Sequence, residues 1–190
     1  MMRQADYSIH QLLLNRWSPR AMSGEAIEDK ELMPLFEAAR WAPSSHNAQP
    51  WRFLFGKRET EHWNPLFELL IEFNRSWVKN AAVLVLIISH RIFEHNGKPS
   101  ITSSFDTGAA WQNLALEGSA RGLVVHGMQG FDYEKAKTVC NLPDDFRAEA
   151  MVAIGKPGNK KDLAPELQKK EFPSSRKPLS EIVMKGKYPS

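Results

Sequence analysis

The chain has 190 residues, of which 42% are hydrophobic and 25% are charged, and its net charge is +3. This length and composition suit one folded domain with a buried core and exclude wholesale disorder. The longest apolar run, Ala81–Ile88, is less than half as long as a membrane-spanning helix must be, and residues 1–10 lack the pattern of a secretory leader. We therefore expect a cytoplasmic protein that does not contact a membrane.

The single cysteine, Cys140, excludes a disulfide within the chain and a metal site with several cysteines. His90 and His95 have no third ligand at a suitable spacing, so no metal is expected. Positive charge is concentrated in residues 156–190, which hold nine Lys or Arg against four Asp or Glu. Because these lysines lie among Pro, Glu and Ser without an aromatic stacking platform, we interpret the segment as a solvated arm and expect no nucleic acid as partner.

In chain order, apolar residues at spacings of three and four first predict an amphipathic helix around residues 32–39. This helix should end near Trp41, because Pro43 disfavours helical geometry in the residue before it. Residues 51–55, WRFLF, are typical of a strand between two turns. A second helix is expected from Glu61 to Arg75.

Ala81–Ile88 is a continuous, β-branched run of the kind found in strands that are covered on both faces. A helix is expected from Asp106 to Arg121, ended by Gly122. A strand, a helix and a strand should follow at residues 123–126, 133–140 and 148–154. The alternation of helices and strands indicates a sheet packed between helices, in an α+β or α/β arrangement.

Two short segments carry more polar groups than a fold requires. In residues 16–20, RWSPR, two guanidinium groups flank a hydroxyl and can converge on a phosphate, although alone this pattern favours a helix end decorated with arginines. In residues 42–51, APSSHNAQPW, two prolines bracket a rigid loop of hydroxyl and amide groups. Such a loop can present donors to a flat heterocycle, or it can form an Asx-type turn that caps the next strand.

The second segment resembles the signature of the FMN-dependent nitroreductase family, and the resemblance extends from about Tyr7 to Pro178. It rests on five patterns in the family's order: R-x-S-x-R at 16–20, P-S-S-x-N-x-Q-P-W at 43–51, N-x-x-W at 74–77, D-x-G-A to N-L at 106–114, and G-K-P at 155–157. The resemblance implies an α+β, nitroreductase-like fold with a mostly antiparallel central sheet between helices, in an intertwined homodimer. Residues 1–190 would be a single FMN-binding domain in which residues 156–190 form an arm that wraps the partner subunit.

The resemblance also implies which residues hold FMN. Arg16 and Ser18, with Trp17 between them, match positions at the phosphate and ribityl chain, and Arg176 matches an arginine on the phosphate. Arg20 matches a basic position near the pyrimidine side of the ring. A cation there would stabilise the negative charge that reduction leaves around N1 and O2, and would raise the reduction potential.

Further residues would surround the flavin ring. Asn74 matches a side chain that bonds the pyrimidine edge. A loop that reaches the flavin from the other subunit is matched by Pro43, Ser44, Ser45 and Asn47. A turn whose N–H groups face N5 and O4 is matched by Met128, Gln129 and Gly130. Trp77 and Ser174 depart from the family, since some members have basic residues at these positions. His126, which ends an apolar strand, is interpreted as a hydrogen-bonded core histidine.

No catalytic side chain is expected, because a flavin performs hydride and electron transfer itself. The resemblance implies that NADH or NADPH reduces FMN at N5 and that an electron-poor small molecule, such as a nitroaromatic or a quinone, then takes the same place in a ping-pong reaction. One alternative is a flavin enzyme of the same fold that reduces an activated C=C bond or removes a halogen. Another is a basic binding protein without reductase activity.

Overall fold

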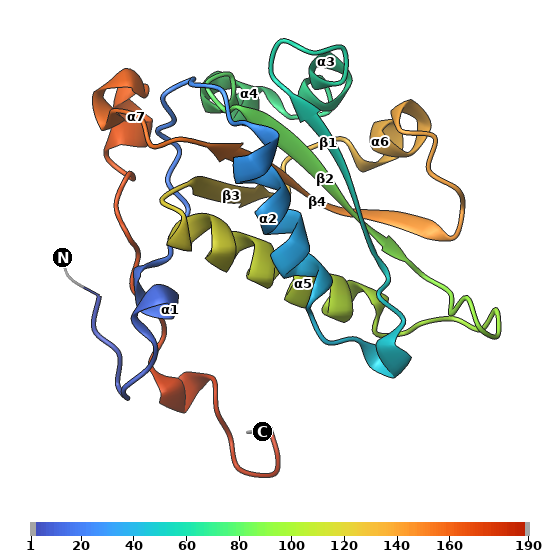
Figure 1. The fold of residues 1–190 in the computed structure, drawn as a ribbon. Helices are drawn as coiled ribbons and strands as arrows, with labels where there is room; N and C mark the ends of the chain where they lie inside the picture. The colour runs from blue at the N-terminus through green and yellow to red at the C-terminus, as the bar shows by residue number, and fades with distance from the viewer. Residues whose placement is uncertain (1–2, 189–190) are drawn as a thin grey trace.

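A four-stranded antiparallel sheet forms the centre of the computed structural model, which describes residues 3–188 (Figure 1). Its strands are β1 (Trp51–Lys57), β2 (Val83–His90), β3 (Val124–Met128) and β4 (Phe146–Gly155). They lie in the order β1-β2-β4-β3, and every neighbouring pair is antiparallel. The expected α+β arrangement with a central antiparallel sheet is confirmed.

Strand β2 lies in the middle of the sheet and is buried along its whole length. Its side chains alternate between two cores, one on each face of the sheet. Leu84, Leu86 and Ile88 pack on one face. Val83, Val85 and Ile87 pack on the other. Because both faces are covered, each residue from Val83 to Ile88 is apolar for a packing reason, which explains the absence of alternation in the sequence.

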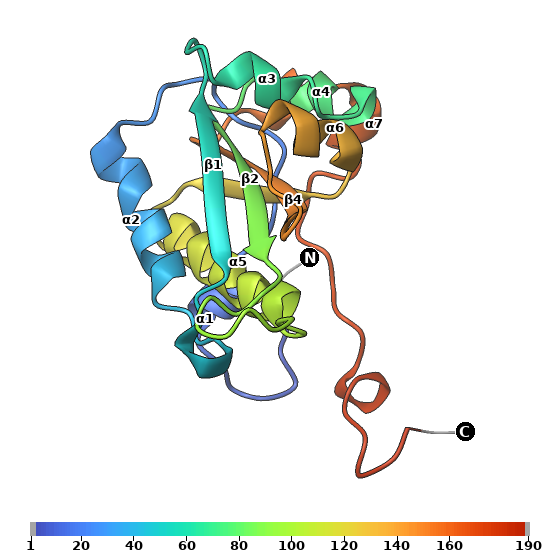
Figure 2. The ribbon, with the colours of Figure 1, turned by 90° about the vertical axis from the view of Figure 1, so that its right-hand side faces the viewer.

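Helices form one layer on each side of the sheet (Figure 2). The helices on one face are α2 (Asp29–Arg40) and α5 (Ser103–Ala120). The helices on the other face are α3 (Trp63–Phe67), α4 (Glu72–Val78) and α6 (Tyr133–Val139). Outside these layers lie α1 (Gln11–Asn15), α7 (Pro165–Gln168) and the 3₁₀ turns η1 (Ser45–Asn47), η2 (Lys160–Asp162) and η3 (Leu179–Glu181). Within residues 3–188, no helix has the length and apolar composition to cross a membrane.

The prediction of one helix from Glu61 to Arg75 is wrong, because α3 ends at Phe67 and α4 begins at Glu72. Between them, Leu70 forms a β-bridge with Phe131, and the Ile71 N–H donates to the Gly130 carbonyl at 3.1 Å. This pairing with a distant turn competes with the helical hydrogen bonds, and local apolar spacing carries no information about it. The break brings α4 against the turn after β3.

The segment after β4 first packs on its own chain and then leaves it. Leu163 and Leu167 are buried in the core on the α3, α4 and α6 face. From Phe172 the chain extends away from the body of the molecule (Figure 2). The apolar side chains of Ile182 and Val183 are exposed there.

Candidate functional site

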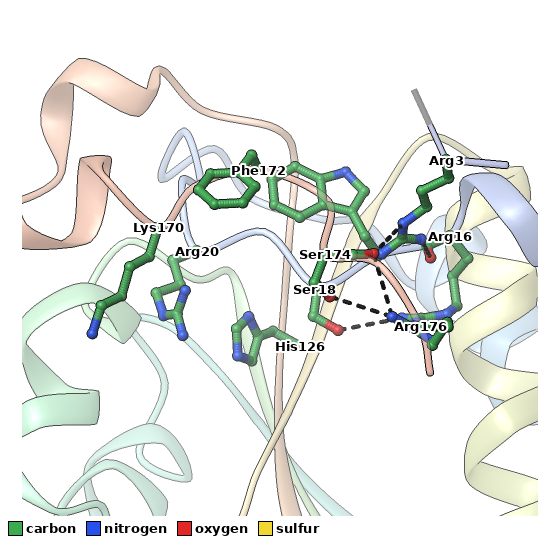
Figure 3. A pocket seen from close by; sticks show the side chains of 10 residues that line it. Arg3, Arg16, Ser18, Arg20, His126, Lys170, Phe172, Ser174 and Arg176 are labelled. Carbon is green, nitrogen blue, oxygen red and sulfur yellow. Dashed lines mark hydrogen bonds between the residues drawn. The ribbon is translucent and has the colours of Figure 1, made fainter. Parts of the chain in front are cut away.

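A cavity of about 310 Å³ opens where residues 16–20, β3 and the C-terminal segment meet (Figure 3). Its lining residues are Arg3, Arg16, Trp17, Ser18, Arg20, His126, Lys170, Phe172, Ser174 and Arg176. Five of these ten carry a positive charge and none is acidic, so the cavity is suited to an anion. It brings together the residues of the RWSPR segment and Arg176, which lie near opposite ends of the chain.

Three guanidinium groups surround the serine hydroxyls on one side of this cavity (Figure 3). Nη1 of Arg16 donates to Oγ of Ser18 at 3.2 Å, and Nη1 of Arg176 lies 3.3 Å from Oγ of Ser174. Burial lowers the pKa of Arg16, and the charge of Arg176 lowers it further. Burial also lowers the pKa of Arg3, and the charges of Arg176 and Arg16 lower it further. Because the arginines repel one another, a bound phosphate would stabilise the arrangement.

Arg3 ties together the segments that form this side of the cavity. Its Nη1 donates to the carbonyls of Leu14 and Arg16 at 3.0 and 2.7 Å, and its Nε donates to the Ser174 carbonyl at 2.9 Å. Sequence analysis missed Arg3 because it lies in a segment with no motif. It also missed Lys170 and Phe172, which flank the buried Glu171 in the turn after α7, where no motif marks them.

On the other side of the cavity, His126 lies beside Arg20 (Figure 3). Its Nδ1 is 2.9 Å from the Pro19 carbonyl, and because a carbonyl only accepts, Nδ1 must carry the proton. Burial lowers the pKa of His126, so the ring is neutral at pH 7. The hydrogen bond agrees with the sequence interpretation, but the residue lines a cavity rather than only the core.

Asn74 connects α4 to the turn that follows β3. Its buried side chain donates from Nδ2 to the Gly130 carbonyl at 2.9 Å. A Cβ atom on Gly130 would lie 2.6 Å from this Nδ2 and 2.7 Å from Cδ1 of Ile71, so a larger residue would displace these two side chains. The Met128 side chain packs in the core, whereas Gln129 is exposed. Of the turn residues Met128, Gln129 and Gly130, the backbone and the Gln129 side chain are free to face a ligand.

The loop between α2 and β1 holds the other four residues of the sequence prediction. Pro43 and Asn47 are exposed, and Asn47 has a φ of 53°, a left-handed conformation that asparagine tolerates well. The Ser45 N–H donates to Oδ2 of Asp106 at 3.0 Å, and Oγ of Ser44 accepts from the Gln49 N–H at 3.0 Å. The loop is thereby fixed to the first turn of α5.

The structure does not bring this loop to the cation-lined cavity within one chain. The loop is bound at Asp106, near the start of α5. Ser119, near the end of α5, lines a second cavity of about 380 Å³ together with Trp17, which also lines the first. At 1.5 Å per residue, the two points of contact are about 20 Å apart along the helix. The two groups of predicted residues therefore lie at opposite ends of α5.

Comparisons with known proteins agree with this fold and with the motifs. The family model described as the nitroreductase family matches residues 13–72 and 60–156. A crystal structure described as an oxidoreductase containing FMN is 41% identical and has a TM-score of 0.94. The match covers 98% of this chain and 96% of the other. A Desulfovibrio desulfuricans protein, described as a nitroreductase in complex with FMN, is 26% identical with a TM-score of 0.73, covering 94% of this chain and 96% of its own.

A curated relative from Streptomyces coelicolor, named for NADH dehydrogenase or NAD(P)H nitroreductase activity, is 30% identical. The match covers 69% of this chain and 74% of the relative. The family model covers every residue from Leu13 to Lys156, a range that includes the loop, the sheet and the RWSPR segment. The chain belongs to the nitroreductase family.

Proposed function

We propose that this protein is an FMN-dependent oxidoreductase that passes reducing equivalents from NADH or NADPH to an electron-poor small molecule, such as a nitroaromatic or a quinone. The observation that supports it most is the cavity in which Arg3, Arg16 and Arg176 converge without an acidic lining residue. A phosphate dianion is the kind of ligand that several guanidinium groups hold through charge-assisted hydrogen bonds. Two similar solved structures are described as containing FMN.

The residues along the cavity fit the parts of FMN. Arg16, Arg176 and the Ser18 hydroxyl would hold the phosphate and the start of the ribityl chain, and Trp17 would flank them. At the other side of the cavity Arg20 offers a cation to the pyrimidine part of the ring. Its Nε is buried and donates to no group within residues 3–188.

The turn after β3 would meet the ring edge. Gln129 and Gly130 directly follow the strand that carries His126 on the cavity wall, and their N–H groups would face the reactive side of the ring. Asn74 would orient this turn through its hydrogen bond to Gly130. When bound, FMN supplies the two-electron transfer between nicotinamide and acceptor. The side chains bind, orient and supply charge, and none needs to act as an acid or a base.

The distance between the loop and the cavity supports a homodimer with two flavin sites at its interface. In a two-fold dimer, residues 43–47 of one subunit can meet the cavity of the other, which their own chain places about 20 Å away. Large apolar side chains lie beside the loop: Trp41, Ile101 and Phe105 are 73%, 96% and 80% exposed. Such a patch is typical of a subunit interface. In this dimer, residues 1–190 form one domain, and the exposed end of residues 156–190 would lie on the partner.

The visible spectrum of the purified protein tests the proposal. After incubation with excess FMN and desalting, we expect a retained flavin spectrum that bleaches when NADPH or NADH is added without oxygen. Steady-state rates with a quinone should then give parallel double-reciprocal lines, because nicotinamide and acceptor would share one site. Retention without bleaching would contradict the oxidoreductase assignment. Loss of all flavin on desalting would contradict the cofactor, and a steep salt dependence of binding to unrelated DNA would favour a basic binding protein instead.

A further inference from the structure

Glu171 is an acidic residue buried immediately behind the cation-lined cavity. Its side chain is 3% exposed, although the surrounding C-terminal segment is basic and mostly solvated. It lines the second cavity, on the far side of residues 19–21 from the first. A buried carboxylate is costly unless hydrogen bonds and opposite charge compensate it, so its partners indicate what it does.

The two carboxylate oxygens of Glu171 have different partners. Oε1 accepts from the backbone N–H groups of Arg20 and Ala21, at 2.7 and 2.9 Å. Oε2 lies 3.9 Å from Nη1 of Arg20 and accepts no hydrogen bond within the described residues 3–188. One oxygen therefore holds the backbone at Arg20, and the other acts on the Arg20 guanidinium through its charge alone. A residue that only fastened the C-terminal segment would not need this second contact.

Arg20 lines the cavity itself and lies beside aromatic neighbours. Its Cζ lies 5.9 Å from the centre of the Trp77 ring, and the Trp77 and His126 rings are 4.6 Å apart. Arg20 and His126 both line the cavity. At His126 the two charges have opposite effects: Arg20 lowers the pKa of the ring and Glu171 raises it, while burial dominates. The charge of Glu171 therefore acts inside the cavity although its side chain does not line it.

We propose that Glu171 is a positioning residue that fixes Arg20 and partly offsets its charge, and that it thereby lowers the reduction potential of the bound flavin. This inference rests on the proposed FMN site. The hydride that NADH or NADPH gives up carries two electrons and one proton to the flavin, which gains negative charge while the nicotinamide becomes oxidised. Arg20 favours this gain of negative charge and Glu171 opposes it, because electrostatic energies follow the sign of each neighbour.

Glu171→Gln separates the two roles of the side chain. The amide oxygen of glutamine can still accept from the Arg20 and Ala21 N–H groups, whereas the negative charge is lost. Measured against a reference dye without oxygen, the flavin of this variant should be easier to reduce. We expect about a tenfold higher ratio of reduced to oxidised flavin at a fixed potential, which is about 30 mV for two electrons. Arg20→Ala should shift the potential in the opposite direction.

The matched control is Glu166→Gln, which removes the same charge from an exposed residue of α7 and should leave the potential unchanged. If Glu171→Gln has the potential of the wild-type protein, or a lower one, Glu171 only fastens the C-terminal segment and the inference is wrong. Equal shifts in both variants would also contradict it. Should Glu171→Gln not fold, Arg20→Gln and the double variant R20Q/E171Q provide the same comparison, and the double variant must have the higher potential.

The same measurements separate this inference from the proposed function. A wild-type protein that retains no FMN contradicts both. A wild-type protein that retains FMN and bleaches, together with an unshifted Glu171→Gln variant, contradicts only the role of Glu171. FMN affinity, from quenching of flavin fluorescence, gives a readout that does not depend on turnover. It should fall in Glu171→Ala, which leaves the Arg20 and Ala21 N–H groups without their acceptor, and stay close to wild type in Glu171→Gln.

Discussion

The cation-lined cavity and the loop at residues 43–47 differ in how their polar groups are satisfied. In the cavity, Arg16 and Arg176 repel each other and no acidic residue lines the wall. In the loop, the Ser45 N–H is bound to Asp106, and Oγ of Ser44 caps the Gln49 N–H. The lining of the cavity therefore does not balance its own positive charge, whereas these polar groups of the loop are paired within the chain.

The largest expected effect comes from removing a cation of the cavity. Arg16→Ala should weaken FMN binding by one to two factors of ten, since hydrogen bonds to charged groups contribute about 1.5–3 kcal/mol each. A titration of FMN fluorescence measures the change. Arg147→Ala is the matched control, because this arginine is exposed on β4, where its side chain is 62% accessible. Unchanged affinity in Arg16→Ala would mean that the cavity does not hold the phosphate.

A smaller effect on FMN affinity is expected from a change in the loop, which lies at the other end of α5. Asn47→Asp keeps the shape of the side chain and tolerates the positive φ, but it replaces a donor with a charged acceptor. If the loop contacts the cofactor, FMN should bind about tenfold more weakly, in keeping with the loss of about 1–3 kcal/mol for an unpaired group. The melting temperature of the FMN-free protein should not change, because the side chain is exposed. Unchanged FMN affinity would show that the loop does not contribute to the FMN site.

Mixing the two variant subunits tests whether the loop serves the partner's cavity. If each site combines the cavity of one chain with the loop of the other, a mixed dimer of Arg16→Ala and Asn47→Asp has one intact site. Random reassociation of equal amounts should then restore about a quarter of the high-affinity FMN sites, as two-fold symmetry requires. If the loop served the cavity of its own chain, every site would carry one defect and nothing would be restored. Each variant taken alone through the same dissociation and reassociation is the control.

How far the sequence predicts this molecule depends on whether a feature is local. Ala81–Ile88 predicts a strand covered on both faces, because its consecutive residues, which point to opposite faces, are all apolar. The break between α3 and α4 could not be predicted, since it depends on the pairing of Leu70 with Phe131. Arg3 was missed because its role depends on carbonyls of other segments. Arg16, Ser18 and Arg176, which the resemblance to a family assigns to the phosphate, line one cavity, and their contact with FMN stays a prediction.

The same limit applies to Glu171 and to the loop. Glu171 is one acid among many lysines, and only the fold reveals that it is buried against Arg20. The residues of the loop were recognised as a motif, but their place at the start of α5 depends on a hydrogen bond to Asp106. Local patterns thus predict elements and motifs, while the pairing of charged groups across the chain requires the structure.

The smallest expected effect concerns His126, the neutral residue among the cavity's cations. Burial lowers its pKa in the folded protein, so below the usual value of about 6.5 the unfolded chain binds a proton that the folded protein resists. The free energy of unfolding should therefore fall as the pH drops below that value, by at most about 1.4 kcal/mol per pH unit for one proton, and should be independent of His126 above it. Urea unfolding of FMN-free protein at pH 7.5, 6.5 and 5.5 measures this loss.

In His126→Gln the loss of stability in acid should be smaller than in the wild-type protein, because glutamine does not titrate. The two proteins are compared by their slopes with pH, so a constant difference caused by the lost contact with the Pro19 carbonyl cancels. Parallel curves would show that the folded protein accepts a proton on His126 as readily as the unfolded chain does. The ring would then add a positive charge beside Arg20 in acid, and the cavity would attract anions more strongly as the pH falls.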